Sequence, residues 1–340
     1  MEKVQLGRTG LMVTRTAFGA LPIQRVDKQQ ASKILCRALD AGINFFDTAR
    51  GYSDSEEKIG FALSKRRNEI IIATKSNAKD GDKLFSDLQT SLKNLKTDYV
   101  DILQLHNPSS PPDPEDENSS YAAMLKAQEK GMIRFLGITN HRLEVARQAV
   151  NSGLYDTLQY PFCHLASEEE VQLVHQCARA NIGFIAMKAL SGGLINHAEA
   201  AFAYLRQYPN VIPIWGIQQL QELEQFIDLE NTLPVLDQRL RKVIANDRRE
   251  LTGSFCRACG YCLPCPAEIP IPTAARMSLL LKRARWWTFI TPERQMQMEK
   301  IQNCRECGKC RERCPYDLDP PKLLKRELNL YREFLNQCSG

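Results

Sequence analysis

Short apolar, β-rich runs alternate with longer segments of helical periodicity along the first 235 residues of the chain. This alternation is typical of a parallel sheet whose strands are connected by crossover helices. The apolar runs predict eight strands, at Thr16–Leu21, Asn44–Thr48, Ile70–Thr74, Val100–Leu105, Arg134–Thr139, Thr157–Tyr160, Gly183–Met187 and Val211–Trp215. The periodic segments predict eight helices, at Gln29–Asp40, Ser55–Lys65, Lys83–Leu95, Tyr121–Lys130, Leu143–Asn151, Ser167–Ala180, Ala198–Gln207 and Leu220–Leu229. Eight strand–helix pairs predict an α/β fold of the (β/α)8 TIM barrel type, with a doubly wound sheet as the alternative.

The alternation of apolar runs with helical segments ends after residue 235. Leu240–Leu251 predicts a charged helical connector, and Thr273–Trp287 and Pro292–Ile301 have helical spacing. A chain of 340 residues is long enough for one large domain and one smaller domain. We therefore expect a barrel domain at residues 1–235 and a small, mostly helical domain at residues 236–340.

Composition indicates a soluble protein. The chain is 43% hydrophobic, and none of its apolar runs approaches the roughly twenty residues of a membrane span. Residues 1–16 mix charges without the apolar core of a secretory signal. We expect a cytoplasmic protein that does not enter a membrane.

Eight of the twelve cysteines lie in two runs, each ending in Cys-Pro. The first run holds Cys256, Cys259, Cys262 and Cys265, and the second holds Cys304, Cys307, Cys310 and Cys314. Two residues between successive thiolates allow three sulfurs to converge on one cluster, so the runs predict iron–sulfur clusters. Zinc is the main alternative, because repeated Cys-x-x-Cys pairs also form tetrahedral sulfur sites, and disulfides are a third.

The two runs together predict two [4Fe–4S] clusters. In two-cluster ferredoxins the fourth cysteine of each run binds the other cluster. Cys256, Cys259, Cys262 and Cys314 would then bind one cluster, and Cys304, Cys307, Cys310 and Cys265 the other. A single cluster is the alternative, because the first run has one residue fewer before its last cysteine.

Positive charge is concentrated in the cysteine-rich part of the chain. Residues 237–340 contain 20 Lys and Arg against 12 Asp and Glu, whereas residues 1–236 contain 25 against 28. The excess either compensates the charge of the clusters or attracts an acidic electron carrier such as a ferredoxin or flavodoxin. Nucleic acid is not an expected partner. The candidate docking residues are Lys282, Arg283, Arg285, Lys309, Arg311 and Arg313.

Polar residues stand where the predicted barrel strands end. Active sites on a (β/α)8 barrel lie at this end of the strands, in the loops to the following helices. Any one of these residues alone is an ordinary feature, but a set in register predicts a site. Its members are Asp47, Lys75, His106, Asn140, Gln159 and Lys188.

The segments around these positions resemble the aldo-keto reductase superfamily, specifically its members with a C-terminal ferredoxin-like domain. The matching segments are Phe45–Tyr52 with Ser55 and Glu56, Ile72–Lys75, Leu103–Asn107 and Gly137–His141. The resemblance covers nearly the whole chain. It implies a catalytic tetrad of Asp47, Tyr52, Lys75 and His106.

Each member of the tetrad has a chemical role that carbonyl reduction requires. Tyr52 is the expected general acid, because the carbonyl oxygen needs a proton when hydride reaches the carbon. A phenol has a pKa near 10, and the Lys75 ammonium would lower that pKa by stabilising the phenolate. Asp47 would hold Lys75 in place, and His106 would hydrogen-bond the substrate carbonyl. A buried Asp–Lys pair with a packing tyrosine is the structural alternative.

The resemblance also implies a nicotinamide cofactor, NADPH or NADH. Asn140 and Gln159 match the family's carboxamide-binding residues, and Met187 stands where many members place an aromatic ring. The segment after the last strand lacks the Lys or Arg that many NADPH-dependent relatives use, which predicts weak preference for NADPH. The full predicted set is Thr139, Asn140, Gln159, Met187, Lys188, Leu190, Gly192, Gly216, Gln218 and Gln219.

Together these features predict a nicotinamide-dependent oxidoreductase that interconverts a small-molecule carbonyl and alcohol and is coupled to electron transfer through the clusters. Two alternatives stay open. One is an ordinary carbonyl reductase with purely structural clusters, and the other is a redox-sensing or electron-relay protein on an aldo-keto reductase scaffold.

Overall fold

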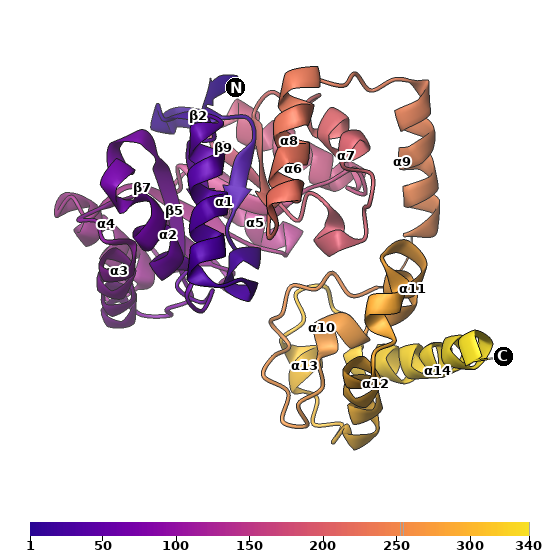
Figure 1. Ribbon diagram of the computed structural model, residues 1–340. Coiled ribbons are helices and arrows are strands. Elements are labelled where there is room, and N and C mark those ends of the chain that lie inside the picture. Colours follow the sequence, from indigo (N-terminus) through magenta and orange to yellow (C-terminus); the bar gives the residue numbers. More distant parts are fainter. Residues whose placement is uncertain (252, 254, 340) are drawn as a thin grey trace. The chain divides into compact units, whose positions relative to one another are not determined.

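Eight parallel strands close into a barrel in the N-terminal part of the chain (Figure 1). The computed structural model describes residues 1–251, 253 and 255–339. The barrel strands are β3 (Ala17–Gly19), β4 (Phe45–Asp47), β5 (Ile71–Ser76), β6 (Val100–His106), β7 (Ile133–Thr139), β8 (Thr157–Pro161), β9 (Gly183–Met187) and β10 (Val211–Gly216). Their order is sequential, and β10 pairs with β3 to complete the ring. The predicted barrel is confirmed, and the doubly wound sheet is wrong because such a sheet is open.

A helix follows each strand, as the crossover between parallel neighbours requires. These helices are α1 (Lys28–Asp40), α2 (Ser55–Leu63), α3 (Gly81–Leu95), α4 (Ser120–Glu129), α5 (Leu143–Ser152), α6 (Glu168–Arg179), α7 (Ala198–Leu205) and α8 (Leu220–Thr232). Short 3₁₀ helices lie at η2 (Pro22–Arg25), η3 (Ser64–Glu69) and η4 (Ser191–Gly193). Every predicted strand and helix of the barrel overlaps an observed one.

The helix ends show why the sequence folds in this way. Ser167 precedes α6 and accepts a hydrogen bond from the Glu170 backbone, while the Glu170 side chain accepts one from the Ser167 backbone. This reciprocal cap satisfies N–H groups that have no partner within the helix. Leu173, Val174 and Cys177 then form the buried face of α6. Capping and periodicity therefore agree on where the helix begins and which side is buried.

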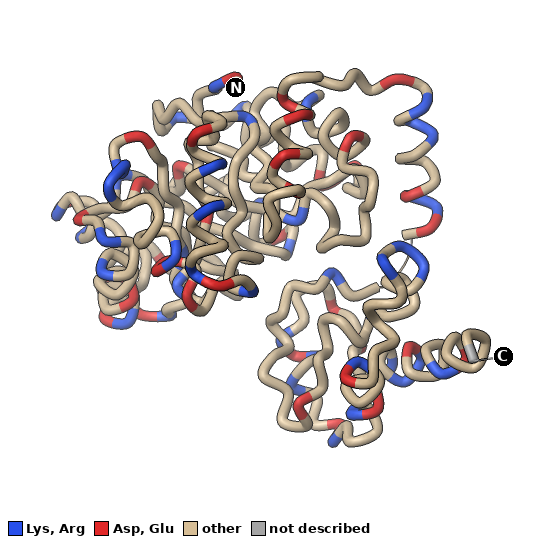
Figure 2. The backbone as a smooth tube through the Cα atoms, in the orientation of Figure 1, with Lys and Arg blue, Asp and Glu red and all other residues tan. Residues whose placement is uncertain are grey.

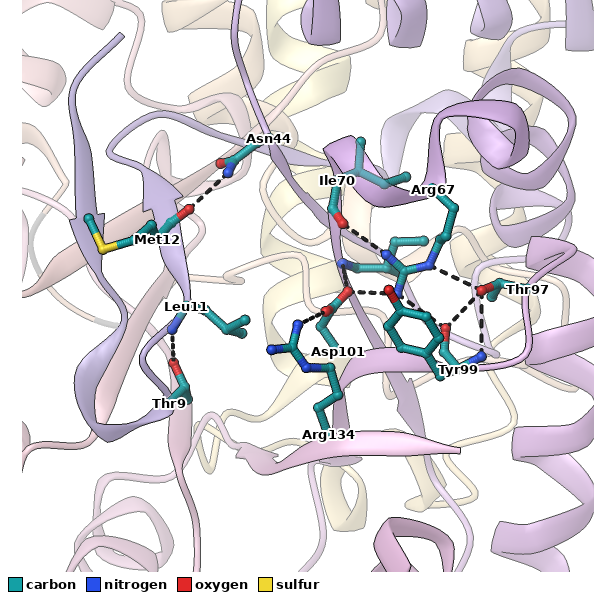
Figure 3. Close-up of polar contacts among 11 residues, drawn as sticks. Thr9, Leu11, Met12, Asn44, Arg67, Ile70, Thr97, Tyr99, Asp101 and Arg134 are labelled. Carbon is teal, nitrogen blue, oxygen red and sulfur yellow. Dashed lines mark hydrogen bonds and ion pairs between the residues drawn. The ribbon is translucent and has the colours of Figure 1, made fainter. Parts of the chain in front are cut away.

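An N-terminal hairpin, which the sequence pattern did not predict, packs on the inner core of the barrel. It consists of β1 (Lys3–Gln5), η1 (Gly7–Thr9) and β2 (Met12–Thr14). Leu6, Leu11 and Val13 belong to the same buried cluster as inward residues of the strands. Asn44, directly before β4, donates a hydrogen bond of 2.8 Å to the Met12 carbonyl (Figure 3). The hairpin therefore lies at the amino ends of the strands.

A buried carboxylate ties together three strands near the same end of the barrel. Asp101, the second residue of β6, is 1% exposed. It accepts hydrogen bonds from Arg67 at 2.7 Å and from Arg134 at 2.8 Å (Figure 3). It also accepts one from the Ile72 backbone at 2.9 Å. The Arg67 side chain also stacks on the Tyr99 ring. These donors compensate the buried charge, and removing one of them would be costly. The group lies away from the strand ends that carry the predicted chemistry.

The second compact unit is helical. It comprises the chain from Gln238 onward together with the segment Leu190–Ala198. Its elements are α9 (Gln238–Glu250), α10 (Ile271–Ala274), α11 (Met277–Arg283), η5 (Trp286–Phe289), α12 (Pro292–Glu299), η6 (Lys300–Asn303), α13 (Lys309–Glu312) and α14 (Pro320–Ser339). None of the described helices is long and apolar enough to cross a membrane.

Two features of this unit differ from the sequence prediction. The expected helix at Thr273–Trp287 is divided into three shorter elements, because the backbone is non-helical at Arg276, with φ of −145°, and again at Ala284, with φ of −119° and ψ of −171°. The long helix α14 was not predicted. It is anchored by the buried Glu327, which accepts a hydrogen bond of 2.7 Å from the Ser278 backbone at the start of α11.

Candidate active site and cluster sites

Asp47 and Lys75 form a buried ion pair inside the barrel. Asp47 is the last residue of β4, and Lys75 lies near the end of the adjacent strand β5. The Lys75 ammonium donates to Asp47 Oδ1 at 2.7 Å, to Asp47 Oδ2 at 2.6 Å and to the Thr48 carbonyl at 2.6 Å. The two side chains are 1% and 2% exposed. Three acceptors match the three hydrogens of an ammonium, so the charge of Lys75 is held in one place.

Burial changes the proton affinity of both partners. It raises the pKa of Asp47 and lowers the pKa of Lys75, while the attraction between the two groups opposes each shift. A lysine in this setting holds its proton less tightly than a lysine in water. While it is protonated, water screens its buried charge only weakly, so it is suited to stabilise a negative charge that forms next to it.

Tyr52 and His106 lie beside this pair. The Lys75 ammonium nitrogen is 5.2 Å from the centre of the Tyr52 ring. The Tyr52 and His106 rings meet edge to face, with centroids 5.9 Å apart and an interplanar angle of 82°. Burial and, second, the charge of Lys75 lower the pKa of His106 to about 3, so its imidazole is neutral near pH 7. The structure thus brings the four residues of the predicted tetrad into one cluster.

Two buried glutamines extend the cluster across the barrel. Gln104 donates to Asp47 Oδ1 at 3.2 Å and to Gln159 Oε1 at 3.0 Å. Sequence reasoning identified Gln159 but missed Gln104. Gln104 could have been identified from its position two residues before His106 on β6, because alternate residues of a strand face the same side.

Glu56 is a second buried carboxylate that sequence reasoning did not assign a role. It lies on α2, is 1% exposed, and accepts hydrogen bonds from Thr74 at 2.7 Å and Asn94 at 3.3 Å. Arg50 forms an ion pair with it. Its charge raises the pKa of Lys75, which opposes the effect of burial. Glu56 therefore helps to keep the lysine protonated.

The predicted carboxamide-binding residues lie at the carboxyl ends of β7 and β8. Thr139 ends β7, and Asn140 follows it and is fully buried. The Asn140 side chain donates to the Pro108 carbonyl at 2.8 Å and accepts from the Arg142 backbone at 2.8 Å. These bonds fix the orientation of the amide. Met187 ends β9 and is 8% exposed, and Lys188 follows in a left-handed conformation with φ of 58°.

The predicted residues after β10 lie at the start of α8. Gly216 ends the strand, and the backbone N–H groups of Gln218 and Gln219 donate to one oxygen of Glu222 at 2.7 and 3.0 Å. A carboxylate therefore occupies the donors that an anionic ligand would otherwise use. Arg25, which sequence reasoning missed, donates to the Gln218 side chain at 3.5 Å.

The remaining predicted cofactor residues, Leu190 and Gly192, belong to the second unit. Gly192 has a φ of 65°, a conformation that residues with a Cβ rarely adopt. The predicted cofactor-binding residues therefore do not all belong to the same structural unit. The sequence pattern did not indicate this.

The eight cysteines of the two runs line two cavities in the second unit. The first cavity is lined by Cys256, Cys259, Cys262 and Cys314. The second is lined by Cys265, Cys304, Cys307 and Cys310, and Cys262 also lines it. The last cysteine of each run thus lies with the first three of the other run. Each crossed set expected from the sequence thus lines one cavity and Cys262 lines both, while the ligation of two clusters stays a prediction.

Among the residues that the structure describes, no group of three or more His, Cys, Asp or Glu is placed to hold a metal ion. Burial and the neighbouring cysteines raise the pKa of Cys262 to about 12. Metal binding would have to overcome this shift, because a thiolate is the form that ligates.

One predicted docking residue is not on the surface. The Arg283 side chain is 7% exposed and forms ion pairs with Asp247 and Glu250. Its expected role in docking an acidic carrier is therefore wrong, because its charge is already neutralised inside the unit. Arg311 pairs with Asp319 at 2.8 Å but remains exposed. Figure 2 shows where the basic residues lie along the backbone.

Comparisons with known proteins agree with both parts of the chain. The Aldo/keto reductase family model matches residues 15–200, and the 4Fe-4S dicluster domain model matches residues 255–319. The uncharacterized oxidoreductase YqkF of Bacillus subtilis is 30% identical over 199 residues, which cover 51% of this chain and 63% of that protein. L-galactose dehydrogenase of Arabidopsis thaliana is 30% identical over 218 residues, which cover 57% and 68%.

Solved structures show the same fold. The holo form of aldo-keto reductase AKR11C1 from Bacillus halodurans has a TM-score of 0.64 at 22% identity, over 73% of this chain and 96% of that chain. A putative aldo-keto reductase from Pseudomonas aeruginosa has a TM-score of 0.61 at 24% identity, over 68% and 94%. The chain spans about two thirds of the length of the curated relatives named above.

Proposed function

Because the chain belongs to the aldo-keto reductase family and carries a 4Fe-4S dicluster domain, we propose that it is a nicotinamide-dependent oxidoreductase that interconverts a carbonyl and an alcohol. The proposal includes electron exchange through the C-terminal clusters. The observation that carries it is the buried Asp47–Lys75 pair, whose ammonium faces the Tyr52 ring with His106 alongside.

The tetrad supplies the proton transfer and the charge stabilisation. Tyr52 donates its hydroxyl proton to the carbonyl oxygen as negative charge develops there. The Lys75 ammonium stabilises the resulting phenolate, and Asp47 keeps that ammonium in place. The neutral His106 imidazole donates a hydrogen bond to the same oxygen and orients the carbonyl.

The donor set at the carboxyl ends of the strands fits a nicotinamide cofactor. When bound, a reduced nicotinamide supplies a hydride to the carbonyl carbon. The amides of Asn140 and Gln159 offer donors and acceptors for a carboxamide, and Thr139 lies next to them. Met187 would pack against the ring. Lys188, Leu190, Gly192, Gly216, Gln218 and Gln219 are the candidates for the rest of the cofactor.

The cysteines fit two [4Fe–4S] clusters. The two cavities, each lined by four cysteines drawn from both runs, support the crossed ligand sets. Two clusters that each carry one electron match the two electrons of one hydride. An acidic one-electron carrier such as a ferredoxin or flavodoxin is the proposed partner, and exposed Lys282, Lys309 and Arg311 are its candidate contacts. The rate at which this carrier reduces the clusters should fall steeply as the salt concentration rises, because screening weakens the attraction between exposed charges.

Clusters with a purely structural role are the second candidate, because metal binding alone can hold a small domain together. The two candidates differ in one measurement. If the clusters carry electrons, chemical reduction of the clusters changes the rate of nicotinamide turnover. An unchanged rate would favour structural clusters.

Replacing Tyr52 with Phe tests the catalytic proposal. The variant should reduce carbonyls at least about a hundredfold more slowly than the wild type, because general acid catalysis contributes that much. Binding of NADH and NADPH should stay nearly intact, since the ring remains. Tyr99→Phe is the matched control, because its ring packs on Arg67 and lies outside the tetrad. Equal turnover by Tyr52→Phe and the control would remove Tyr52 from the mechanism.

A further inference from the structure

The loop between β4 and α2, residues 48–54, carries Tyr52 and is bound to the strand that carries Lys75. The Arg50 backbone N–H donates to the Lys75 carbonyl at 2.9 Å. The Lys75 ammonium donates in turn to the Thr48 carbonyl at 2.6 Å. The position of the phenol relative to the ammonium therefore depends on the conformation of this segment, which we call the Tyr52 loop.

Glu56 joins the Tyr52 loop to β5 on the side of the strand opposite the Lys75 side chain. One of its carboxylate oxygens accepts a hydrogen bond from Thr74 at 2.7 Å. The other oxygen forms the ion pair with Arg50 and accepts a hydrogen bond from Asn94 at 3.3 Å. Because neighbouring residues of a strand face opposite sides, Glu56 contacts β5 directly behind the lysine.

The surroundings of Glu56 suit a buried negative charge. Its two oxygens accept from three donors, one of which is a guanidinium. It also lies in the first turn of α2, where the partial positive charge of the helix N-terminus favours a carboxylate. The next residue, Glu57, lies in the same turn but is exposed. Burial and bonding thus distinguish two adjacent residues of the same type.

The charged and titratable groups around Lys75 come from four parts of the barrel. Asp47 lies on β4, His106 on β6, Tyr52 in its loop and Glu56 on α2. Burial lowers the pKa of Lys75, while the attraction of Asp47 and, after it, that of Glu56 raises this pKa. Loss of the Glu56 charge would therefore make the lysine give up its proton more readily.

We propose that Glu56 is a positioning residue of the tetrad, which holds the Tyr52 loop against β5 through Arg50 and Thr74. The inference rests on the proposed reduction of a carbonyl by Tyr52 and Lys75. Glu56 is not a catalytic residue, because its contacts lie behind the strand and not at the reacting atoms. It has two effects on the tetrad: it fixes the place of the phenol, and its charge favours the protonated lysine.

Glu56→Gln tests this role, because the substitution removes the charge and keeps the shape of the side chain. With para-nitrobenzaldehyde and NADPH, kcat should fall about tenfold, because the phenol is held less firmly. The KM for NADPH should stay within about twofold. The alkaline midpoint of the kcat–pH profile should move down by about one pH unit, because Lys75 loses its proton more readily. Glu57→Gln is the matched control, and removal of that exposed charge should change neither kcat nor the profile.

Two further variants separate the effect of charge from that of geometry. Glu56→Asp keeps the charge but shortens the side chain, so kcat should fall while the alkaline midpoint stays at the wild-type pH. Arg50→Gln breaks the ion pair at its partly exposed end and should have the same two effects. Glu56→Gln with the wild-type kcat and profile would overturn the proposal, and so would a loss of stability without a shift of the profile. If Glu56→Gln does not fold, Arg50→Gln with the wild-type kcat would overturn it.

Amide hydrogen exchange tests the positioning role without any turnover. The Arg50 N–H is hydrogen-bonded to the Lys75 carbonyl, so its exchange reports how firmly the loop is held. Exchange in residues 48–54 should be faster in Glu56→Gln than in the wild type and unchanged in Glu57→Gln. A wild type that reduces no carbonyl would contradict the proposed function, and exchange would still decide the positioning role. Equal exchange in Glu56→Gln and the wild type would then overturn it.

Discussion

Replacing Lys75 with Met removes one partner of the buried ion pair and leaves the other in place. Asp47 is 2% exposed and loses two hydrogen bonds of 2.6 and 2.7 Å, while the 3.2 Å bond from Gln104 remains. Leaving a buried charge without its partner typically costs about 3–5 kcal/mol of stability. The variant should also reduce carbonyls at least about a hundredfold more slowly, because the charge that stabilises the Tyr52 phenolate is gone.

The loss of stability should depend on pH with a definite sign. Burial already raises the pKa of Asp47, and the attraction of Lys75 lowers it, so removing Lys75 raises that pKa further. The folded variant then binds a proton more tightly than the unfolded chain, in which the pKa of Asp47 is ordinary. Its stability therefore falls as pH rises through the folded pKa and recovers as pH falls. The variant should be closer to the wild type at about pH 5 than at about pH 8.

Anaerobic urea denaturation followed by circular dichroism measures this effect at both pH values. The double variant Asp47→Asn/Lys75→Met is the control, since it removes both charges and should regain most of the lost stability. Its reductase activity should stay low. A Lys75→Met protein with the wild-type urea midpoint at both pH values would refute the argument, because a buried unpaired carboxylate cannot be without cost.

Three further predictions follow from other parts of the molecule. Anaerobically prepared protein should contain about eight iron atoms and about eight acid-labile sulfides per chain, as two clusters require. About four of each would mean a single cluster, and zinc without sulfide would exclude iron–sulfur clusters. Asp101→Asn should lower the free energy of unfolding by about 3 kcal/mol in urea titrations, because the substitution weakens the ion pairs with Arg67 and Arg134. It should leave kcat unchanged, because residue 101 lies far along β6 from His106. In binding titrations, the Kd values of NADPH and NADH should differ by no more than about tenfold, because the Glu222 carboxylate occupies the backbone N–H groups of Gln218 and Gln219. A preference for NADPH above about a hundredfold would contradict this prediction.

The barrel could be predicted from the sequence because its signals are repeated and local. Each strand is a short apolar run and each helix has its own period and caps, as in α6 with its Ser167 cap. The N-terminal hairpin has three residues in each strand, which is too few for a pattern to stand out. The division at Arg276 depends on one backbone conformation that the periodicity of Thr273–Trp287 does not reveal.

The candidate site shows a similar limit. The position after an apolar strand was enough to identify Asp47, Lys75 and His106. The spacing of the cysteines was enough to indicate iron–sulfur binding. Gln104 is hidden within a strand, and its role depends on a partner 57 residues away. Arg283 was misjudged because charge counting treats every basic residue as exposed. Its burial depends on Asp247, which only the folded chain brings to it.

The membership of Leu190–Ala198 in the second unit also limits how this protein can be divided. A truncated chain that ends at Asp237 would keep the segment but lose the residues with which it forms one unit, including Arg283, which donates a hydrogen bond to the Leu194 carbonyl. The iron–sulfur domain is therefore not a removable module, and barrel-only expression or domain exchange would require a redesigned loop after β9.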